Sequence, residues 1–184
     1  MRPSAGWREA MLVLLALAVP AAGAAAQQSA DPPRVPGKLP PPVSPACVSS
    51  PFGPRHRVGP HAATFHNGID FPAAPGTWVR AVLPGEVVEV RRLGSEGLEV
   101  ALRHGDAHQG GFVTRYAHLG TVAPELADGR HEVKAGDRLG RVGRTGVTYG
   151  THLHFELRVQ GKPVDPEPFF AVARCAGEAE AAVR

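Results

Sequence analysis

The stretch GTHLHFEL, from Gly150 to Leu157, places two histidines one residue apart and a glutamate two residues further on. Successive side chains of an extended strand point to opposite faces, so His152, His154 and Glu156 would share one face and the apolar residues between them the other. Imidazole and carboxylate groups carry protons and bind metal ions, so this face is a candidate for either chemistry. The pattern alone also fits a half-buried strand whose polar face meets water.

A second candidate pair of side chains lies in FHNGIDF, from Phe65 to Phe71. If this segment is extended, His66 and Asp70 lie on one face above a largely apolar underside. Asn67-Gly68 could instead form a tight turn, which would break that alternation. Alone, a histidine four residues before an aspartate is a weak signal, but beside His-x-His it supplies the rest of a metal site.

Zinc is the metal that these donors suit. A catalytic zinc ion commonly takes three protein ligands from histidine, aspartate and glutamate and keeps a fourth position for water. Other catalytic motifs are excluded: HEVKA at His131 has Ala135 where a second histidine is required, and no Gly-x-Ser-x-Gly elbow is present. The His154–Glu156 segment also lacks the Pro-Cys-x-x-Cys partner of a zinc deaminase.

The chain has nine histidines, and a solvated surface position is expected for most of them. Five stand in glycine-rich or polar stretches: His56, His61, His104, His108 and His131. The other four stand in segments with the composition of short strands: His66, His118, His152 and His154. These four are therefore the candidates for a site.

Several short segments rich in valine, leucine and aromatic residues are separated by glycine or proline. They are TWVRAVL, GEVVEVRRL, LEVALRH, GFVTRYAHL, RLGRVG and THLHFELRV. No amphipathic helix of ordinary length occurs among them, although Val122–Ala127 could form a single turn. This spacing predicts an all-β or nearly all-β domain. The core is expected to take up these aromatic residues: Phe52, Trp78, Phe155, Phe169 and Phe170.

Small β-sandwich carrier domains that bear a lipoyl or biotinyl group are one alternative. The pieces APGTWVRAVLPGEVVEV and VKAGDRLGRVGRTG share their rhythm of a glycine turn followed by a short strand. Such a carrier needs a lysine at a hairpin tip, but Lys134 precedes the turn residues Ala135 and Gly136. A carrier function is therefore disfavoured.

The first 26 residues have the composition of a secretion signal: a positive start, an apolar run from Ala10 to Val19, and the cleavage site Ala24-Ala25-Ala26. A retained membrane anchor is the alternative, but Pro20 interrupts an apolar run already short for a bilayer. We expect residues 1–26 to be a signal peptide, 27–46 a proline-rich linker, 47–175 the folded domain and 176–184 a flexible tail. No stable membrane anchor is expected after cleavage.

Charge and cysteine content fit an exported protein without nucleic-acid partners. Removing residues 1–26 takes away two arginines and one glutamate, which lowers the net charge from +3 to +2. This bias is too weak to indicate nucleic acid or a strongly anionic surface. The two cysteines, Cys47 and Cys175, lie near the two ends of the domain, and in an oxidising compartment they favour one disulfide over two free thiols.

Taken together, these motifs resemble the lysostaphin-like or LytM-type zinc endopeptidases, which cut peptidoglycan cross-bridges. The resemblance runs from SPFGPR at Ser50 to PVDPEPFF ending at Phe170, and it includes HNGIDF, RYAHL and GTHLHFELRVQGKPVDP. It implies a small, mainly antiparallel β-sandwich or half-barrel with an active-site groove. The resemblance, from Ser50 to Phe170, covers most of the expected domain of residues 47–175.

The resemblance also implies roles for the candidate residues. His66, Asp70 and His154 correspond to the ligands of one zinc ion, and His118 and His152 to the two catalytic histidines. The expected reaction is hydrolysis of a peptide bond by a zinc-activated water, with the two histidines handling the proton or the oxyanion. Glu156 is expected to steady a ligand imidazole or the sheet instead of acting as the base.

The expected partner is the peptide cross-bridge of peptidoglycan, reached by a monomer in the periplasm, the cell envelope or outside the cell. Related domains that have lost ligands act as non-enzymatic activators of other wall hydrolases, which is the alternative function. All five positions carry the expected residue here. The sequence therefore favours the enzyme.

Overall fold

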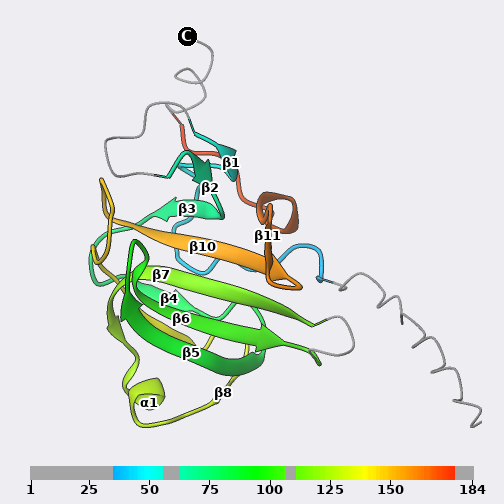
Figure 1. Ribbon diagram of the computed structural model, residues 1–184, viewed down its shortest axis with the longest axis vertical. Coiled ribbons are helices and arrows are strands. Elements are labelled where there is room, and N and C mark those ends of the chain that lie inside the picture. The colour runs from blue at the N-terminus through cyan, green and yellow to red at the C-terminus, as the bar shows by residue number, and fades with distance from the viewer. Residues whose placement is uncertain (1–34, 56–62, 107–110, 177–184) are drawn as a thin grey trace, which may run out of the picture.

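The computed structural model describes residues 35–55, 63–106 and 111–176, and nearly all of its regular structure is β (Figure 1). The strands are β1 (Gly53–Pro54), β2 (Phe65–His66), β3 (Ile69–Pro72), β4 (Trp78–Arg80), β5 (Gly85–Leu93), β6 (Gly97–His104), β7 (Phe112–Val122), β8 (Glu132–Val133), β9 (Arg138–Val142), β10 (His152–Val159) and β11 (Lys162–Val164). A helical turn α1 (Pro124–Ala127) and a 3-10 turn η1 (Glu167–Phe169) complete them. The predicted all-β class and the single turn near residue 124 are confirmed.

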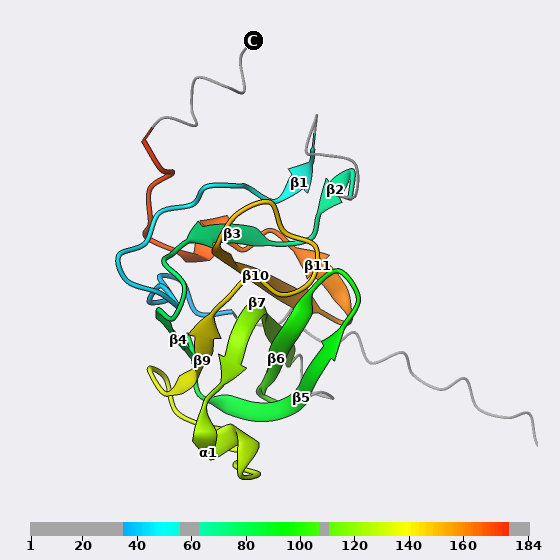
Figure 2. The ribbon, with the colours of Figure 1, turned by 90° about the vertical axis from the view of Figure 1, so that its left-hand side faces the viewer.

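Strand β7 is the centre of the main sheet. The path β11-β10-β7-β6-β5-β8 is antiparallel throughout, while β3 pairs with β10 and β9 joins β7 to β4. Figure 2 shows how β5, β6, β7 and β9 curl around one end of the molecule, with β3 and β10 crossing above them. Because β10 lies between β3 and β7, its residues adjoin two other segments of the chain.

The core lies between the main sheet and the segments that fold across it. Leu153, Phe155 and Leu157 alternate along β10 and have no exposed surface. Phe155 packs edge-on against Tyr116 and Phe170, with ring centroids 5.3 Å apart in both pairs. The alternation predicted for GTHLHFEL is therefore present, and its apolar face fixes the register that turns His152 and His154 toward the opposite side.

The expected positions of two individual side chains, His104 and Trp78, are wrong. His104 was expected at the surface but is buried, because its ring nitrogens lie 2.7 Å from the carbonyl of Pro84 and from the hydroxyl of Thr114. Trp78 was expected in the core but is only half-buried on β4. The guanidinium groups of Arg138 and Arg141 lie 4.4 and 3.7 Å from its ring centroid, which gives the indole a cationic surface environment.

The last part of the predicted linker packs on the domain. Leu39 and Val43 belong to the core cluster, and the backbone amide of Leu39 donates to the carbonyl of Phe169. Cys47 and Cys175 form a disulfide across 128 residues of chain. The predicted signal peptide, the linker before residue 35 and the tail from residue 177 lie outside the described residues. Over the described ranges, no helix is long and apolar enough to span a membrane.

Candidate metal centre and catalytic cleft

His66 and Asp70 reach the same cleft across a bend instead of along one strand. β2 ends at His66, and β3 begins at Ile69 after the bend residues Asn67 and Gly68. A Cβ at Gly68 would lie 2.2 Å from the carbonyl oxygen of Phe155, so only glycine allows β10 to approach this closely. The bend is not a hairpin, because β2 pairs with β1 and β3 with β10.

Pairing between strands brings the other candidate side chains to the same place. His154 on β10 is opposite Asp70 on β3 and opposite Ala117 on β7. His118 follows at an irregularity in the β6–β7 pairing and has φ 59°, an uncommon conformation for a residue with a side chain. Such a bulge re-aims a side chain, and here His118 comes within 4.9 Å of the ring of His152 between centroids.

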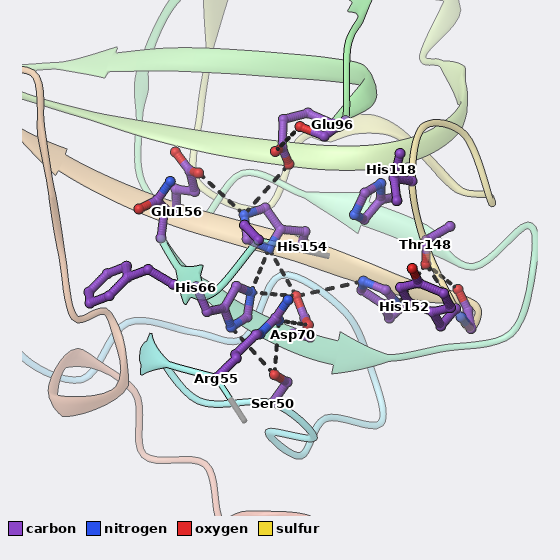
Figure 3. A pocket seen from close by; sticks show the side chains of 17 residues that line it. Ser50, Arg55, His66, Asp70, Glu96, His118, Thr148, His152, His154 and Glu156 are labelled. Carbon is purple, nitrogen blue, oxygen red and sulfur yellow. Dashed lines mark hydrogen bonds and ion pairs between the residues drawn. The ribbon is translucent and has the colours of Figure 1, made fainter. Parts of the chain in front are cut away.

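Three donor atoms meet at one point at the base of the cleft (Figure 3). The Nε2 of His66 lies 3.1 Å from Oδ1 of Asp70 and 2.9 Å from Nδ1 of His154, and the last two atoms are 2.9 Å apart. Zinc bonds of 2.0–2.1 Å place neighbouring ligands of a tetrahedron about 3.3 Å apart. The triangle therefore has nearly the size of one face of a zinc coordination shell.

The hydrogen bonds around the triangle decide which lone pairs point into it. The Nδ1 of His66 lies 2.8 Å from the carbonyl oxygen of Pro51 and donates to it, so the neutral ring keeps its lone pair on Nε2. In a neutral His154, Nε2 donates to Oε1 of Glu156 at 3.3 Å, which leaves the lone pair on Nδ1. Two nitrogen lone pairs and the Asp70 carboxylate would then repel one another, and a cation between them satisfies all three. The donor set therefore fits zinc.

The pKa shifts of Asp70 and His154 show that this cluster favours a positive charge. Burial opposes the charged form of Asp70, but hydrogen bonds with His154 and His66 outweigh it and hold the pKa of this carboxyl well below its usual range. Burial lowers the pKa of His154, yet hydrogen bonds with Asp70 and Glu156 prevail and raise it to about 10. A divalent cation bound between these groups would supply that positive charge.

Glu156 holds His154 and does not face the centre of the cleft. Its Oε2 accepts a hydrogen bond of 2.6 Å from Nε of Arg158, and its Oε1 lies against the far edge of the His154 ring. Burial raises the pKa of Glu156, but the hydrogen bonds with His154 and Arg158 outweigh it and bring the pKa to about 2. A permanently charged carboxylate that orients an imidazole is the arrangement expected from the sequence.

The two remaining histidines both present Nε2 to the cleft. Nδ1 of His118 donates to the carbonyl oxygen of Thr145 at 2.8 Å. Nδ1 of His152 lies 3.3 Å from the hydroxyl oxygen of Thr148, whose hydrogen goes to the carbonyl of Gly150, so the imidazole donates. Burial lowers the pKa of both histidines below the ordinary value, which favours the neutral ring with a lone pair on Nε2.

Two side chains that line one wall of the cleft, Ser50 and Arg55, were not predicted from the sequence. Nη2 of Arg55 donates to Oδ2 of Asp70 at 2.8 Å and to the hydroxyl of Ser50 at 2.9 Å. The Ser50 hydroxyl lies 3.4 Å from Nδ1 of His66. Both residues belong to SPFGPR, the first motif of the family resemblance. The motif was therefore recognised, but neither residue was assigned a function.

The opposite wall is built from two turns. Ser95 and Glu96 stand at the turn between β5 and β6, and Val147, Thr148 and Tyr149 stand in the loop before β10. The glycine-containing loop from Gly143 to Gly150 was expected either to form a groove wall or to be a simple turn. Its later residues line the cleft.

The sequence model of peptidase family M23 matches residues 64–166, which is more than half of the chain. This chain belongs to peptidase family M23. The expected resemblance is thereby confirmed, and each of the five candidate residues lies within the matched M23 region.

Curated relatives of this M23 chain include proteins named as endopeptidases. The DD-carboxypeptidase/endopeptidase Mpg of Neisseria meningitidis is 40% identical over 119 residues, and peptidoglycan DD-endopeptidase ShyA of Vibrio cholerae is 39% identical over 120 residues. These alignments cover 65% and 64% of this chain but 26% of each relative. The chain thus matches about a quarter of the length of either relative.

Solved structures confirm the lysostaphin-like M23 fold. The catalytic domain of lysostaphin from Staphylococcus simulans superposes with a TM-score of 0.57 at 29% identity, covering 67% of this chain and 91% of that chain. A zinc-containing peptidase from Vibrio cholerae gives a TM-score of 0.58 at 28% identity over 71% of this chain and 39% of that chain.

Proposed function

We propose that the chain is an exported zinc-dependent endopeptidase that hydrolyses peptide cross-links of bacterial peptidoglycan. The observation that carries the proposal is the convergence of three potential ligand atoms, from His66, Asp70 and His154, beside two histidines whose Nδ1 atoms are held by hydrogen bonds. The disulfide fits an oxidising compartment, which agrees with export to the periplasm or beyond. We propose a monomer, because every residue of this constellation comes from one chain.

In this proposal His66, Asp70 and His154 hold the metal, and Arg55 and Glu156 keep two of these ligands in place. A bound zinc ion supplies Lewis acidity, which polarises a peptide carbonyl and makes water a nucleophile near neutral pH. Arg55 engages Oδ2 of Asp70, so that Oδ1 stays turned toward the two ligand imidazoles. Glu156 does the same for His154 through Nε2.

His118 and His152 would accept the proton from the attacking water and pass it to the leaving amine. Each donates Nδ1–H to a fixed acceptor, which leaves Nε2 as a base directed into the cleft. A ring that takes the proton from the attacking water becomes an imidazolium, which can stabilise the developing oxyanion and then protonate the leaving amine. Burial lowers the pKa of both rings, which favours the neutral form that a general base requires.

The bond that we propose as substrate joins D-alanine to a diamino acid. Support comes from the relatives Mpg and ShyA, whose names describe cleavage between D-configured centres. The non-catalytic activator remains the second candidate, because the family resemblance includes domains of that kind.

The test is digestion of purified peptidoglycan with the zinc-loaded protein, followed by mass spectrometry of the soluble fragments. We expect cross-linked dimers to fall and monomers with a new D-alanine carboxyl end to rise, with no effect from a His118→Ala variant of equal zinc content. Unchanged dimers in this digestion, together with increased activity of a second wall hydrolase added to it, would replace the enzyme by the activator.

A further inference from the structure

Glu96 is the carboxylate of the cleft that lacks an arginine or lysine partner. Asp70 has Arg55 at 2.8 Å and Glu156 has Arg158 at 2.6 Å. Among residues 35–55, 63–106 and 111–176, no lysine or arginine lies within ion-pair distance of Glu96. Its nearest cationic group is Nε2 of His154 at 3.8 Å, which is closer to Glu156 at 3.3 Å. Arg91 attracts Glu96 only at longer range, because its guanidinium is directly paired with Glu89 and Glu99. Glu96 thus brings to the cleft a carboxylate without a direct cationic partner from lysine or arginine.

The backbone holds this carboxylate in position. The carbonyl oxygen of Glu96 accepts the amide of His118 at 3.0 Å, and the hydroxyl of Ser95 donates to its Oε1 at 2.9 Å. The carbonyl of Ser95 in turn accepts the amide of Val147 at 2.8 Å. A Cβ on Gly97 would lie 2.4 Å from the backbone of Thr145, so the turn and the loop before β10 are in close contact. Little conformational entropy is then lost when a ligand binds.

Glu96 is also accessible and lies near the proposed scissile bond. About a third of its side chain, 32%, is exposed, and Figure 3 shows it above His154, on the side of that ring away from Asp70. Exposed apolar side chains line the same wall, with Val147 at 42% and Tyr149 at 55%. An extended peptide advances about 3.3 Å per residue, so the carboxylate is within reach of a residue close to the bond cut at the metal.

The chemistry of the cross-link offers a matching group. When D-alanine is joined to a diamino acid, the donor stem carries a second diamino acid whose side-chain amine stays free and is an ammonium at neutral pH. The D-configured carbon that bears this amine also bears a carboxyl group, so the free end is zwitterionic. A fixed carboxylate with solvent access can pair with its ammonium while the substrate's own carboxylate faces water. We propose that Glu96 forms a subsite that binds this free ammonium, and the inference rests on the peptidoglycan endopeptidase function proposed above.

The test compares two synthetic cross-linked dimers that differ only in acetylation of the free amine. The wild-type protein should cleave the acetylated dimer with a kcat/KM about tenfold lower, mainly through KM, which is the loss expected for one charge-assisted hydrogen bond. The Glu96→Gln variant should cleave both dimers with the kcat/KM that the wild-type protein shows for the acetylated dimer. Glu125→Gln, which changes an exposed carboxylate on α1 remote from the cleft, should keep the wild-type preference.

A binding measurement separates this inference from the function on which it rests. In a catalytically silent His118→Ala background, calorimetry should give tighter binding of the free-amine dimer, and the added Glu96→Gln change should remove the difference. If the wild-type protein cleaves both dimers equally, the subsite is overturned and the endopeptidase stands. If Glu96→Gln lowers kcat equally for both dimers, Glu96 acts through His154 and the subsite is also overturned. If no dimer is cleaved, the endopeptidase fails, and the binding preference alone decides the subsite.

Discussion

Nδ1 of His154 lies 2.9 Å from Oδ1 of Asp70, and the two residues are cross-strand partners on β10 and β3. Directly opposed residues on antiparallel strands have neighbouring Cβ atoms, so strand pairing alone brings this imidazole and this carboxylate together. A one-residue shift of β10 would bury His154 in the apolar core and expose Leu153 and Phe155. Burial of the apolar face is therefore what holds the residues of the proposed metal site in register.

Replacing His152 and replacing His154 by alanine should have different effects on zinc content and activity. His154→Ala should lose both zinc and activity, because two remaining protein ligands make a poor site. His152→Ala should keep most of its zinc and lose hydrolysis by a factor of about 100 or more, the range for a proton-transfer group or oxyanion donor. Zinc content by elemental analysis and cleavage of cross-linked peptidoglycan are measured on each variant. A metal-free His152→Ala beside a zinc-loaded His154→Ala would reverse the assignment.

Arg55 should strengthen zinc binding without touching the metal. In Arg55→Ala, Oδ2 of Asp70 loses its charged donor, and the carboxylate is free to turn away from the ligand imidazoles. Loss of such a supporting contact typically lowers metal affinity about 10–100-fold. Titration against a chromophoric chelator measures the affinity. Arg80→Ala, an exposed arginine on β4, is the matched control, and equal affinities in both variants would exclude the role.

His104 should make the fold less stable in acid. Burial lowers the pKa of this histidine below the ordinary 6.5, although the hydrogen bond with Pro84 partly opposes it. As pH falls through 6.5, the unfolded chain therefore takes up a proton that the folded chain does not, and the free energy of unfolding decreases. Above that pH, both states are neutral and the effect vanishes.

Chemical denaturation at several pH values between 7 and 5, with zinc in excess, measures this dependence. His104→Gln should be less stable at pH 7 but should lose less stability on acidification than the parent. The exposed His131→Gln variant should follow the parent. If the free energy of unfolding changed with pH as steeply in His104→Gln as in the parent, His104 would have the same pKa in the folded and unfolded states, and the prediction would be wrong.

The disulfide between Cys47 and Cys175 should stabilise the domain mainly by restricting the unfolded chain. Closing a loop of this length contributes about 5 kcal/mol to the free energy of unfolding. The double variant Cys47→Ser, Cys175→Ser should lose stability of that order in chemical denaturation and keep its zinc. Mass mapping without reductant identifies the pair in the parent protein, and two free thiols there would contradict the structure.

The sequence was most informative where side chains alternate on regular strands. The polar and apolar faces of β10 follow from a period of two, and the apolar one is fully buried. His118 could not be placed in this way, because a bulge and a positive φ set its direction, and neither has a local signature in RYAHL. Only the family resemblance pointed to it.

Other features depend on contacts between segments far apart in the sequence. Arg55 reaches Asp70 across 15 residues, and Glu96 meets His154 only because the β5–β6 turn folds over β10. His104 is buried through its contacts with Pro84 and Thr114, which its polar neighbours in the sequence do not reveal. Composition also suggested a spacer for residues 35–46, where Leu39 and Val43 in fact supply core contacts.

Hydrolysis of one defined cross-linked dimer in heavy-oxygen water tests the central claim most directly. The dimer joins D-alanine to a diamino acid, and mass spectrometry follows its cleavage by the zinc-loaded protein. The account predicts two monomers, with one heavy oxygen in the new D-alanine carboxyl group, and no cleavage by the zinc-loaded His118→Ala variant or by the chelator-treated protein until zinc is restored. An intact dimer after incubation with folded, zinc-loaded protein would contradict it.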